Sequence, residues 1–403
     1  MKPRSFSERW NRFFFEPQRP TSVALFRILY GLLNIANLAL LRPDWLTWYG
    51  RHAYMSMETM NRLSWGPRIN LFVLFPQTDF AVNVFFWIFL AFSVSLTVGF
   101  MTRLSCVAVF ICLISMHERN LYILNGADSV MRVTGFFLMF APAGGALSID
   151  RLRRIRAGRE GAEVPLYSPW AQRMIQLQVS VIYLSTVGLK LYGKSWRNGT
   201  AIYYVLRLNA FRRFPVPFSN NLFLIRFFTW ATLVVEFAIG ALVWIVSLRY
   251  AVLIAATLLH LFIEYSMNLP VFELMMMSTY VTFIYPEDLS RAWKWIARRA
   301  GPRLGATATV VYDATSDDAL RTANLLRALD VFDRLRILDA HSTEGAAAFP
   351  LAAGGNGSVQ YITDKRVQAG FAGLCSIAPL VPLLWPLALF GLFRNRAPEP
   401  EAA

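Results

Sequence analysis

Charged residues are scarce in this chain of 403 amino acids. Asp, Glu, Lys and Arg make up 16% of it, against roughly 25% in soluble globular domains. Hydrophobic residues reach 56% and aromatic residues 15%. Several uninterrupted apolar runs reach a length of about 20 residues, which is enough to span a bilayer. The composition excludes an ordinary soluble protein and predicts an all-α polytopic membrane bundle.

Cysteine and histidine are also rare, with three and four copies. Cys106 and Cys112 share one apolar run and Cys375 lies far away. This spacing predicts neither a disulfide framework nor a metal site. The sequence contains no nucleophile triad and no glycine-rich phosphate loop. Its first apolar run lacks a small-residue cleavage site, which predicts a full span rather than a signal peptide.

The net charge of +15 does not indicate nucleic-acid binding. The arginines cluster beside apolar runs, where positive charge sets membrane orientation and meets anionic headgroups. We therefore expect membrane lipids as partners and no nucleic acid. Residues 1–20 mix arginines with aromatics, a pattern typical of an amphipathic segment lying in the membrane interface.

The apolar runs predict about eight transmembrane helices. They cover residues 21–41, 80–100, 103–116, 128–142, 171–192, 222–246, 250–269 and 271–285. The positive-inside rule places both termini in the cytoplasm, together with the most basic connection, 151–159. The basic loop 193–221 is the exception, because this orientation puts it outside.

After residue 301 the pattern changes to short strands around one amphipathic helix, which predicts a small soluble α/β unit. The expected organisation is an interfacial segment (1–20), a membrane domain (21–290), a basic linker (291–305) and the α/β domain (306–396). The apolar stretch 370–393 is long enough to span a membrane, but its three prolines interrupt helical hydrogen bonds. We favour a helix packed on the α/β unit or on the membrane surface over a ninth span.

Ionisable residues inside the predicted spans are the candidate site. Seven side chains belong to this group: Asp128, Arg132, Lys190, Trp196, Glu236, His260 and Glu264. The predicted topology places most of them in the outer half of the bundle, with Glu236 near mid-span. Lys190 and His260 are the catalytic candidates, because a lysine and a histidine beside carboxylates suit proton transfer; the others are candidate substrate-binding residues.

A structural role is the alternative for this group. Buried charges must pair whether or not they act in catalysis, and Asp128–Arg132 and Lys190–Glu264 are the pairs that we expect. Lys190 alone could also extend to the interface beside a tryptophan. A single polar cluster in the outer half of the bundle is compatible with both interpretations.

The chain resembles a known membrane family in short motifs that occur in a specific order. These are Leu25-Phe26-Arg27 with Gly31, Asn125-Gly126-Ala127-Asp128 with Arg132, Leu147-Ser148-Ile149-Asp150, Gly188 and Lys190 with Trp196 and Gly199, Glu236, and His260 followed by Pro270. Over residues 20–286 the chain is similar to the horizontally transferred transmembrane domain family, whose best-known members are vitamin K-dependent gamma-carboxylases. The resemblance implies a membrane protein whose carboxylase relatives use a lysine as the proposed base.

The sequence departs from the carboxylase pattern at two positions. The second of two consecutive lysines, the base in the carboxylases, corresponds to Leu191. A histidine expected shortly before the Ser148-Ile149-Asp150 motif corresponds to Gly145. These differences argue against authentic carboxylation. No cofactor is identified, although a quinone-like molecule is one candidate ligand.

The C-terminal unit resembles the DCC-type thiol-disulfide oxidoreductase family, which has a thioredoxin-like fold. The similarity covers Val310-Val311-Tyr312-Asp313, the segment 325–339 and the apolar tail to Arg396. The two cysteines of that family would fall at Ser316 and Ala319, so the thiolate chemistry is lost. The resemblance implies a degenerate domain kept for binding or stability, in a bacterial inner-membrane protein.

Two functions remain open, and whether the protein is an enzyme is undecided. The first is a membrane enzyme that acts on a lipid or quinone-like substrate at the outer face of the bundle. The second is a non-catalytic assembly, export or immunity factor whose C-terminal domain binds a protein partner.

Overall fold

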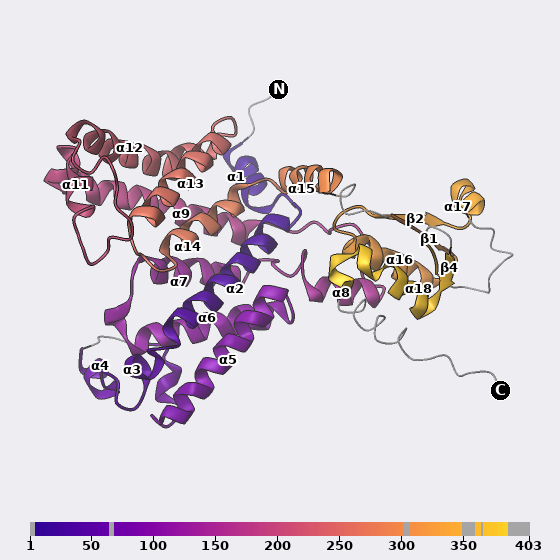
Figure 1. Cartoon of the computed structure of the whole chain (residues 1–403), viewed down its shortest axis with the longest axis horizontal. Helices are drawn as coiled ribbons and strands as arrows, with labels where there is room; N and C mark the ends of the chain where they lie inside the picture. The colour runs from indigo at the N-terminus through magenta and orange to yellow at the C-terminus, as the bar shows by residue number, and fades with distance from the viewer. Residues whose placement is uncertain (1–4, 64–67, 301–306, 349–358, 364–365, 386–403) are drawn as a thin grey trace. The chain divides into compact units, whose positions relative to one another are not determined.

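The fold is taken from a computed structural model. It describes residues 5–63, 68–300, 307–348, 359–363 and 366–385. The chain divides into two compact units (Figure 1). The membrane unit comprises Met1–Ser148 and Leu166–Tyr285, and the C-terminal unit comprises Ile149–Pro165 and Pro286–Ala403. The basic connection after the fourth expected span therefore belongs to the second unit.

The regular secondary structure of the membrane unit is helical over its described residues. Its α-helices are α1 Phe6–Phe15, α2 Thr21–Leu41, α3 Trp45–Tyr49, α4 Met57–Leu63, α5 Asp79–Val98, α6 Thr102–Arg119, α7 Gly126–Leu138, α9 Trp170–Tyr192, α10 Lys194–Arg197, α11 Ala201–Val205, α12 Leu222–Ala241, α13 Arg249–Ser266 and α14 Phe272–Tyr280. The predicted helical fold class of this unit is thus confirmed.

Four stretches among the described residues are long and apolar enough to cross a membrane: α2, α5, α9 and Leu222–Trp244. The other spans expected from sequence correspond to shorter or more polar helices. For example, α7 has 13 residues and α14 has 9. The count of eight spans remains a prediction.

Arg27 on α2 binds backbone carbonyls of the segment that follows α7 and of the end of α5. Its side chain is fully buried, and the guanidinium donates hydrogen bonds to the carbonyls of Ala143 at 2.8 Å and Leu147 at 2.5 Å. A weaker bond at 3.4 Å reaches the Thr97 carbonyl near the end of α5. Arg27 therefore satisfies backbone acceptors that hydrocarbon could not satisfy.

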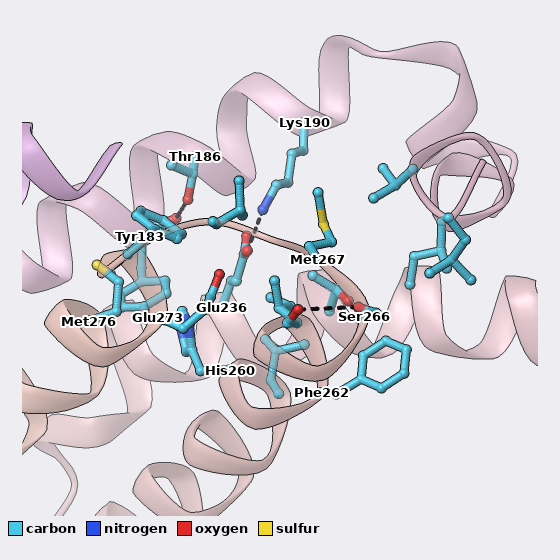
Figure 2. A pocket seen from close by; sticks show the side chains of 18 of the residues that line it. Tyr183, Thr186, Lys190, Glu236, His260, Phe262, Ser266, Met267, Glu273 and Met276 are labelled. Atoms are coloured by element: carbon cyan, nitrogen blue, oxygen red, sulfur yellow. Dashed lines mark hydrogen bonds and ion pairs between the residues drawn. The ribbon is translucent and has the colours of Figure 1, made fainter. Parts of the chain in front are cut away.

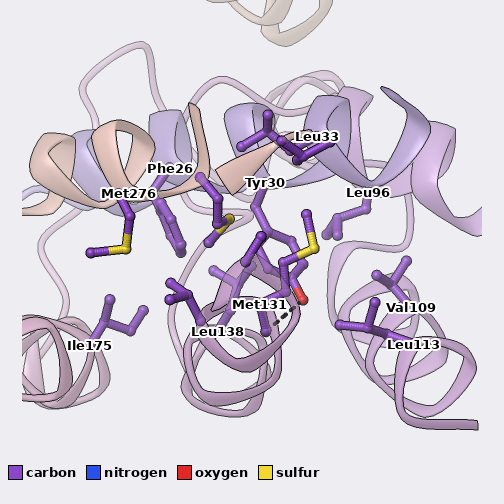
Figure 3. Close-up of a cluster of buried hydrophobic side chains, with 14 of the residues drawn as sticks. Phe26, Tyr30, Leu33, Leu96, Val109, Leu113, Met131, Leu138, Ile175 and Met276 are labelled. Carbon is purple, nitrogen blue, oxygen red and sulfur yellow. Dashed lines mark hydrogen bonds between the residues drawn. The ribbon is translucent and has the colours of Figure 1, made fainter. Parts of the chain in front are cut away.

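Helix α2 also packs closely against α5 and α7. A Cβ atom on Gly31 would lie 2.3 Å from Oγ1 of Thr97, so only glycine permits this approach. In the surrounding apolar core, the Tyr30 hydroxyl donates a 3.0 Å hydrogen bond to the Met131 carbonyl (Figure 3). This contact joins α2 to α7 and gives the buried phenol its partner.

Three parts of the membrane unit meet at one end of the bundle. The Ser22 hydroxyl, at the start of α2, donates a 2.6 Å hydrogen bond to the carbonyl of Ile284. Gln18 forms a β-bridge with Tyr167, just before α9. The chain thus enters α2 and leaves the unit after Tyr285 at the same end.

The C-terminal unit is built on a four-stranded mixed sheet. Its elements are α8 Ile149–Arg156, α15 Pro286–Ala300, β1 Ala308–Tyr312, α16 Asp317–Leu329, β2 Leu335–Asp339, α17 Thr343–Ala348, β3 Gln360–Thr363, β4 Arg366–Ala369 and α18 Gly370–Ile377. The strand order is β2-β1-β3-β4, with β1 and β2 parallel and the other pairs antiparallel. This confirms a small C-terminal α/β unit.

The apolar stretch after β4 contributes to the core of this unit. Ile377, Ala378, Val381 and Leu384 are buried against the residues of β1 and α16. The described part of the tail therefore packs on the sheet, as we favoured from its prolines. Residues from 386 onward, including Pro386 and the segment up to Arg396, lie outside the described residues.

Candidate functional site

A cavity of about 280 Å³ lies in the membrane unit, between α9, α12, α13, α14 and the short helix α11. Most of its lining is aliphatic or aromatic. The ionisable and aromatic polar side chains in its wall are Trp196 and five that Figure 2 labels: Tyr183, Lys190, Glu236, His260 and Glu273. An apolar cavity with a few convergent polar groups is the common form of a small-molecule site.

Helical spacing explains why these groups share one space. Tyr183, Thr186 and Lys190 stand at i, i+3 and i+7 on α9, so they project from one face. Thr232 and Glu236 have an i, i+4 relationship on α12. All five line the cavity.

Lys190 forms an ion pair with Glu236 across the cavity. Figure 2 shows its side chain extending from α9 to the carboxylate on α12. The Lys190 ammonium also lies 5.0 Å from the centroid of the Trp196 ring, within cation–π range. The expected pair with Glu264 is wrong, because Lys190 pairs with Glu236 and Glu264 pairs with Arg213 instead.

His260 is the centre of a chain of buried hydrogen bonds. Its Nδ1 pairs with Glu273, and its Nε2 lies 2.6 Å from the Tyr183 hydroxyl. The Tyr183 hydroxyl in turn lies 2.5 Å from that of Tyr280. With Glu273 ionised, its carboxylate can only accept; Nδ1–H then donates to Glu273, Nε2 accepts from Tyr183, and Tyr183 accepts from Tyr280.

Two carboxylate oxygens in the cavity wall have no protein partner among the described residues. They are Oε2 of Glu236 and Oε1 of Glu273. Glu236 is 7% exposed and Glu273 is fully buried. Buried acceptors are normally satisfied, so these two oxygens lack the hydrogen-bond partner that such atoms usually have.

The connection between α9 and α12 covers the cavity. Ile202 and Leu206 from this segment belong to the lining. Arg213 pairs with Glu264 and donates a 3.2 Å hydrogen bond to the Asn268 side chain. Arg213 thereby fastens the connection to the end of α13, and Glu264 serves this contact rather than the cavity.

Asp128 and Arg132 belong to a second polar cluster, outside the cavity lining. Asp128 lies 3.1 Å from Nε2 of His117 and caps α7 by accepting from the Asn125 backbone at 2.7 Å. Arg132 contacts Glu118 at 2.5 Å. The expected Asp128–Arg132 pair is absent from the ion pairs of the described residues, because each residue instead pairs with the end of α6.

Thus four of the seven predicted residues line one cavity, namely Lys190, Trp196, Glu236 and His260. Sequence reasoning missed Glu273 and the tyrosines that contact His260. Glu273 was detectable, because it is the only acidic residue between Pro270 and Tyr285. The tyrosines carried no comparable signal in a chain so rich in aromatic residues.

Comparison with known proteins agrees with this architecture. Residues 15–288 match the HTTM domain. Uncharacterized protein YitO of Bacillus subtilis (strain 168) is 23% identical over 286 residues, which cover 67% of this chain and 89% of YitO. No solved structure matches the chain. The chain is therefore a membrane protein that belongs to the HTTM domain family, the vitamin K-dependent carboxylase-like transmembrane domains.

Proposed function

We propose that the membrane unit binds a lipid-like or quinone-like molecule in the cavity and exchanges protons with it. One observation carries this proposal: Glu236 and Glu273, which both line a mostly apolar cavity, each carry a buried carboxylate oxygen without a hydrogen-bond partner among the described residues. Such atoms are costly to bury without a hydrogen-bond partner. Intramembrane ionisable residues that face a cavity are typical of functional sites.

The hydrogen-bond chain supplies a route for the proton. Tyr183 can pass its proton to Nε2 of His260, and the resulting imidazolium is stabilised by Glu273, the residue paired with Nδ1. Tyr183 then acts as the base toward a ligand, and Glu273 orients the imidazole. This division of roles follows the general logic of an acid–base pair positioned by a carboxylate.

The same arrangement favours a reaction other than vitamin K-dependent carboxylation. Leu191 occupies the position where the resemblance expects the base. It is 47% exposed and is absent from the cavity lining. The only lysine in that lining, Lys190, is neutralised by Glu236.

A second candidate is a non-catalytic factor whose C-terminal unit binds a protein partner. The sheet order β2-β1-β3-β4 with a helix between the parallel strands supports a thioredoxin-like fold. Ser316 caps α16, accepting from the backbone of Ala319, where the resemblance expects a redox cysteine pair. A thioredoxin-like unit without the cysteine pair favours binding over redox chemistry.

We further propose that the protein lies in a bacterial inner membrane with both termini in the cytoplasm. The start of α2 and the exit after Tyr285 share one end of the bundle. The basic segments that leave from this end would then be cytoplasmic, in accord with the positive-inside rule.

Decylubiquinone binding to the full chain in lipid nanodiscs tests the cavity. Quinones quench nearby tryptophan fluorescence, and Trp196 lies in the wall. We expect saturable quenching that Thr186→Phe abolishes by filling the cavity. Thr257→Phe is the matched control. The Thr257 hydroxyl, like that of Thr186, donates a hydrogen bond to a backbone carbonyl of its own helix, but Thr257 is absent from the cavity lining. Equal binding by both variants would contradict the proposal.

A further inference from the structure

Helix α15 presents a basic face that the cavity does not explain. Arg291, Lys294, Trp295, Arg298 and Arg299 stand at i, i+3, i+4, i+7 and i+8, so they share one side of the helix. All five are exposed, and Trp295 retains 52% of its accessible surface. The two acidic residues of the helix, Glu287 and Asp288, lie in its first turn.

The opposite side of α15 contacts the rest of the C-terminal unit through Trp293. Ala297 is buried, and the Trp293 indole donates a 2.7 Å hydrogen bond to the Val331 carbonyl. The Trp293 ring also contacts the Phe332 ring at 6.0 Å between centroids. The helix is therefore oriented, and its basic face points away from its packing partners.

Most cations on this face lack a carboxylate. Arg291 pairs with Asp288, whereas Lys294, Arg298 and Arg299 form no ion pair with any residue in the described part of the chain. Arg299 instead stacks over Trp295, 4.2 Å from the ring centroid. Uncompensated cations beside an exposed tryptophan match the chemistry of anionic headgroups.

Chain continuity places the start of α15 next to the end of the membrane unit. Pro286, the first residue of α15, directly follows Tyr285, the last residue of the membrane unit. The exit point lies at the end of the bundle where the transmembrane helix α2 begins, because Ser22 binds Ile284. The helix thus starts within reach of phospholipid headgroups.

We propose that the basic face of α15 binds anionic phospholipid headgroups and so holds the C-terminal unit against the leaflet from which it emerges. This role involves no cavity residue and stands independently of the proposed function.

An environment-sensitive dye reports this contact in the full chain. The dye is attached at Trp295→Cys in a Cys375→Ser background, since Cys106 and Cys112 are buried. Nanodiscs contain phosphatidylcholine alone or with phosphatidylglycerol. We expect the dye at 295 to become more shielded when phosphatidylglycerol is added, and a dye at the exposed Ala347→Cys position to be unaffected.

Charge variants separate headgroup recognition from apolar contact. Lys294→Gln/Arg298→Gln/Arg299→Gln should lose the phosphatidylglycerol response, with partitioning reduced on the order of fivefold per cation removed. Lys294→Arg/Arg298→Lys/Arg299→Lys keeps the charge and should keep the response. Salt near 1 M, where the Debye length is about 3 Å, should also suppress it. Equal shielding in phosphatidylcholine alone, or no shielding in either lipid, would overturn the proposal.

Discussion

Lys190 on α9 is paired with Glu236 on α12, and this ion pair forms part of the wall of the cavity. The side chains of the two residues retain 24% and 9% of their accessible surface, so water screens the pair weakly. The pair therefore neutralises both charges inside an apolar space and joins two helices.

Removing one partner of this pair should destabilise the protein strongly. Lys190→Met leaves the Glu236 carboxylate buried without its cation, which typically costs roughly 3–5 kcal/mol. Lys190→Met/Glu236→Gln removes both charges and should recover most of that loss. Thermal unfolding in detergent, followed by size-exclusion chromatography, measures the difference. Arg213→Met, at the more exposed pair with Glu264, should cost less than Lys190→Met. A Lys190→Met protein as stable as the parent would refute this account of the pair.

Two glycines in the transmembrane helices should respond oppositely to alanine. Gly31→Ala should cost roughly 1–3 kcal/mol, because its Cβ would lie 3.1 Å from the Thr97 Cα as well as close to the hydroxyl. Gly188 has no atom within 4 Å of its virtual Cβ, so Gly188→Ala should be neutral or stabilising by up to about 1 kcal/mol. The same melting assay compares them, and equal losses at both positions would show that α2 and α5 do not approach as described.

The C-terminal unit should lose stability in acid through Asp313. The Thr315 hydroxyl and backbone N–H, and then His341, hold the pKa of the Asp313 carboxyl below its usual value. Because the pKa of Asp313 is lower in the folded than in the unfolded state, its ionised carboxylate stabilises the folded state at pH values above the unfolded pKa of about 3.9. This contribution is lost as the pH falls through the pKa of the folded state. Amide hydrogen exchange around β1 in the full chain should show this loss, and Asp313→Asn should remove its pH dependence. An unchanged pH profile in Asp313→Asn would argue against Asp313 as the cause.

The orientation of the bundle can be tested by cysteine labelling. Arg156→Cys and Asn198→Cys introduce thiols at exposed positions that we assign to opposite sides of the membrane. A membrane-impermeant maleimide added to intact spheroplasts should label position 198 and spare position 156 until the cells are lysed. Labelling of position 156 in intact spheroplasts would reverse the orientation.

The sequence identifies the types of residue at the site but does not predict which residues they pair with. Lys190, Glu236 and His260 stood out because ionisable groups are rare in apolar helices. Their pairing depends on how each helix is rotated and which helix it faces, and neither property is local. In the sequence the basic loop 193–221 carries only a topology signal, whereas in the structure Arg213 of this loop pairs with Glu264. The sheet order was likewise readable only from the structure, because short strands do not encode their neighbours.

The central claim is that the cavity walled by Tyr183, Glu236, His260 and Glu273 holds a ligand. An electron cryomicroscopy map of the full chain, purified into nanodiscs with native lipids, tests this most directly. We predict density inside the cavity, within hydrogen-bond distance of Oε2 of Glu236 or Oε1 of Glu273. A well-ordered map in which these oxygens turn to protein donors and the cavity is closed by side chains would contradict the account.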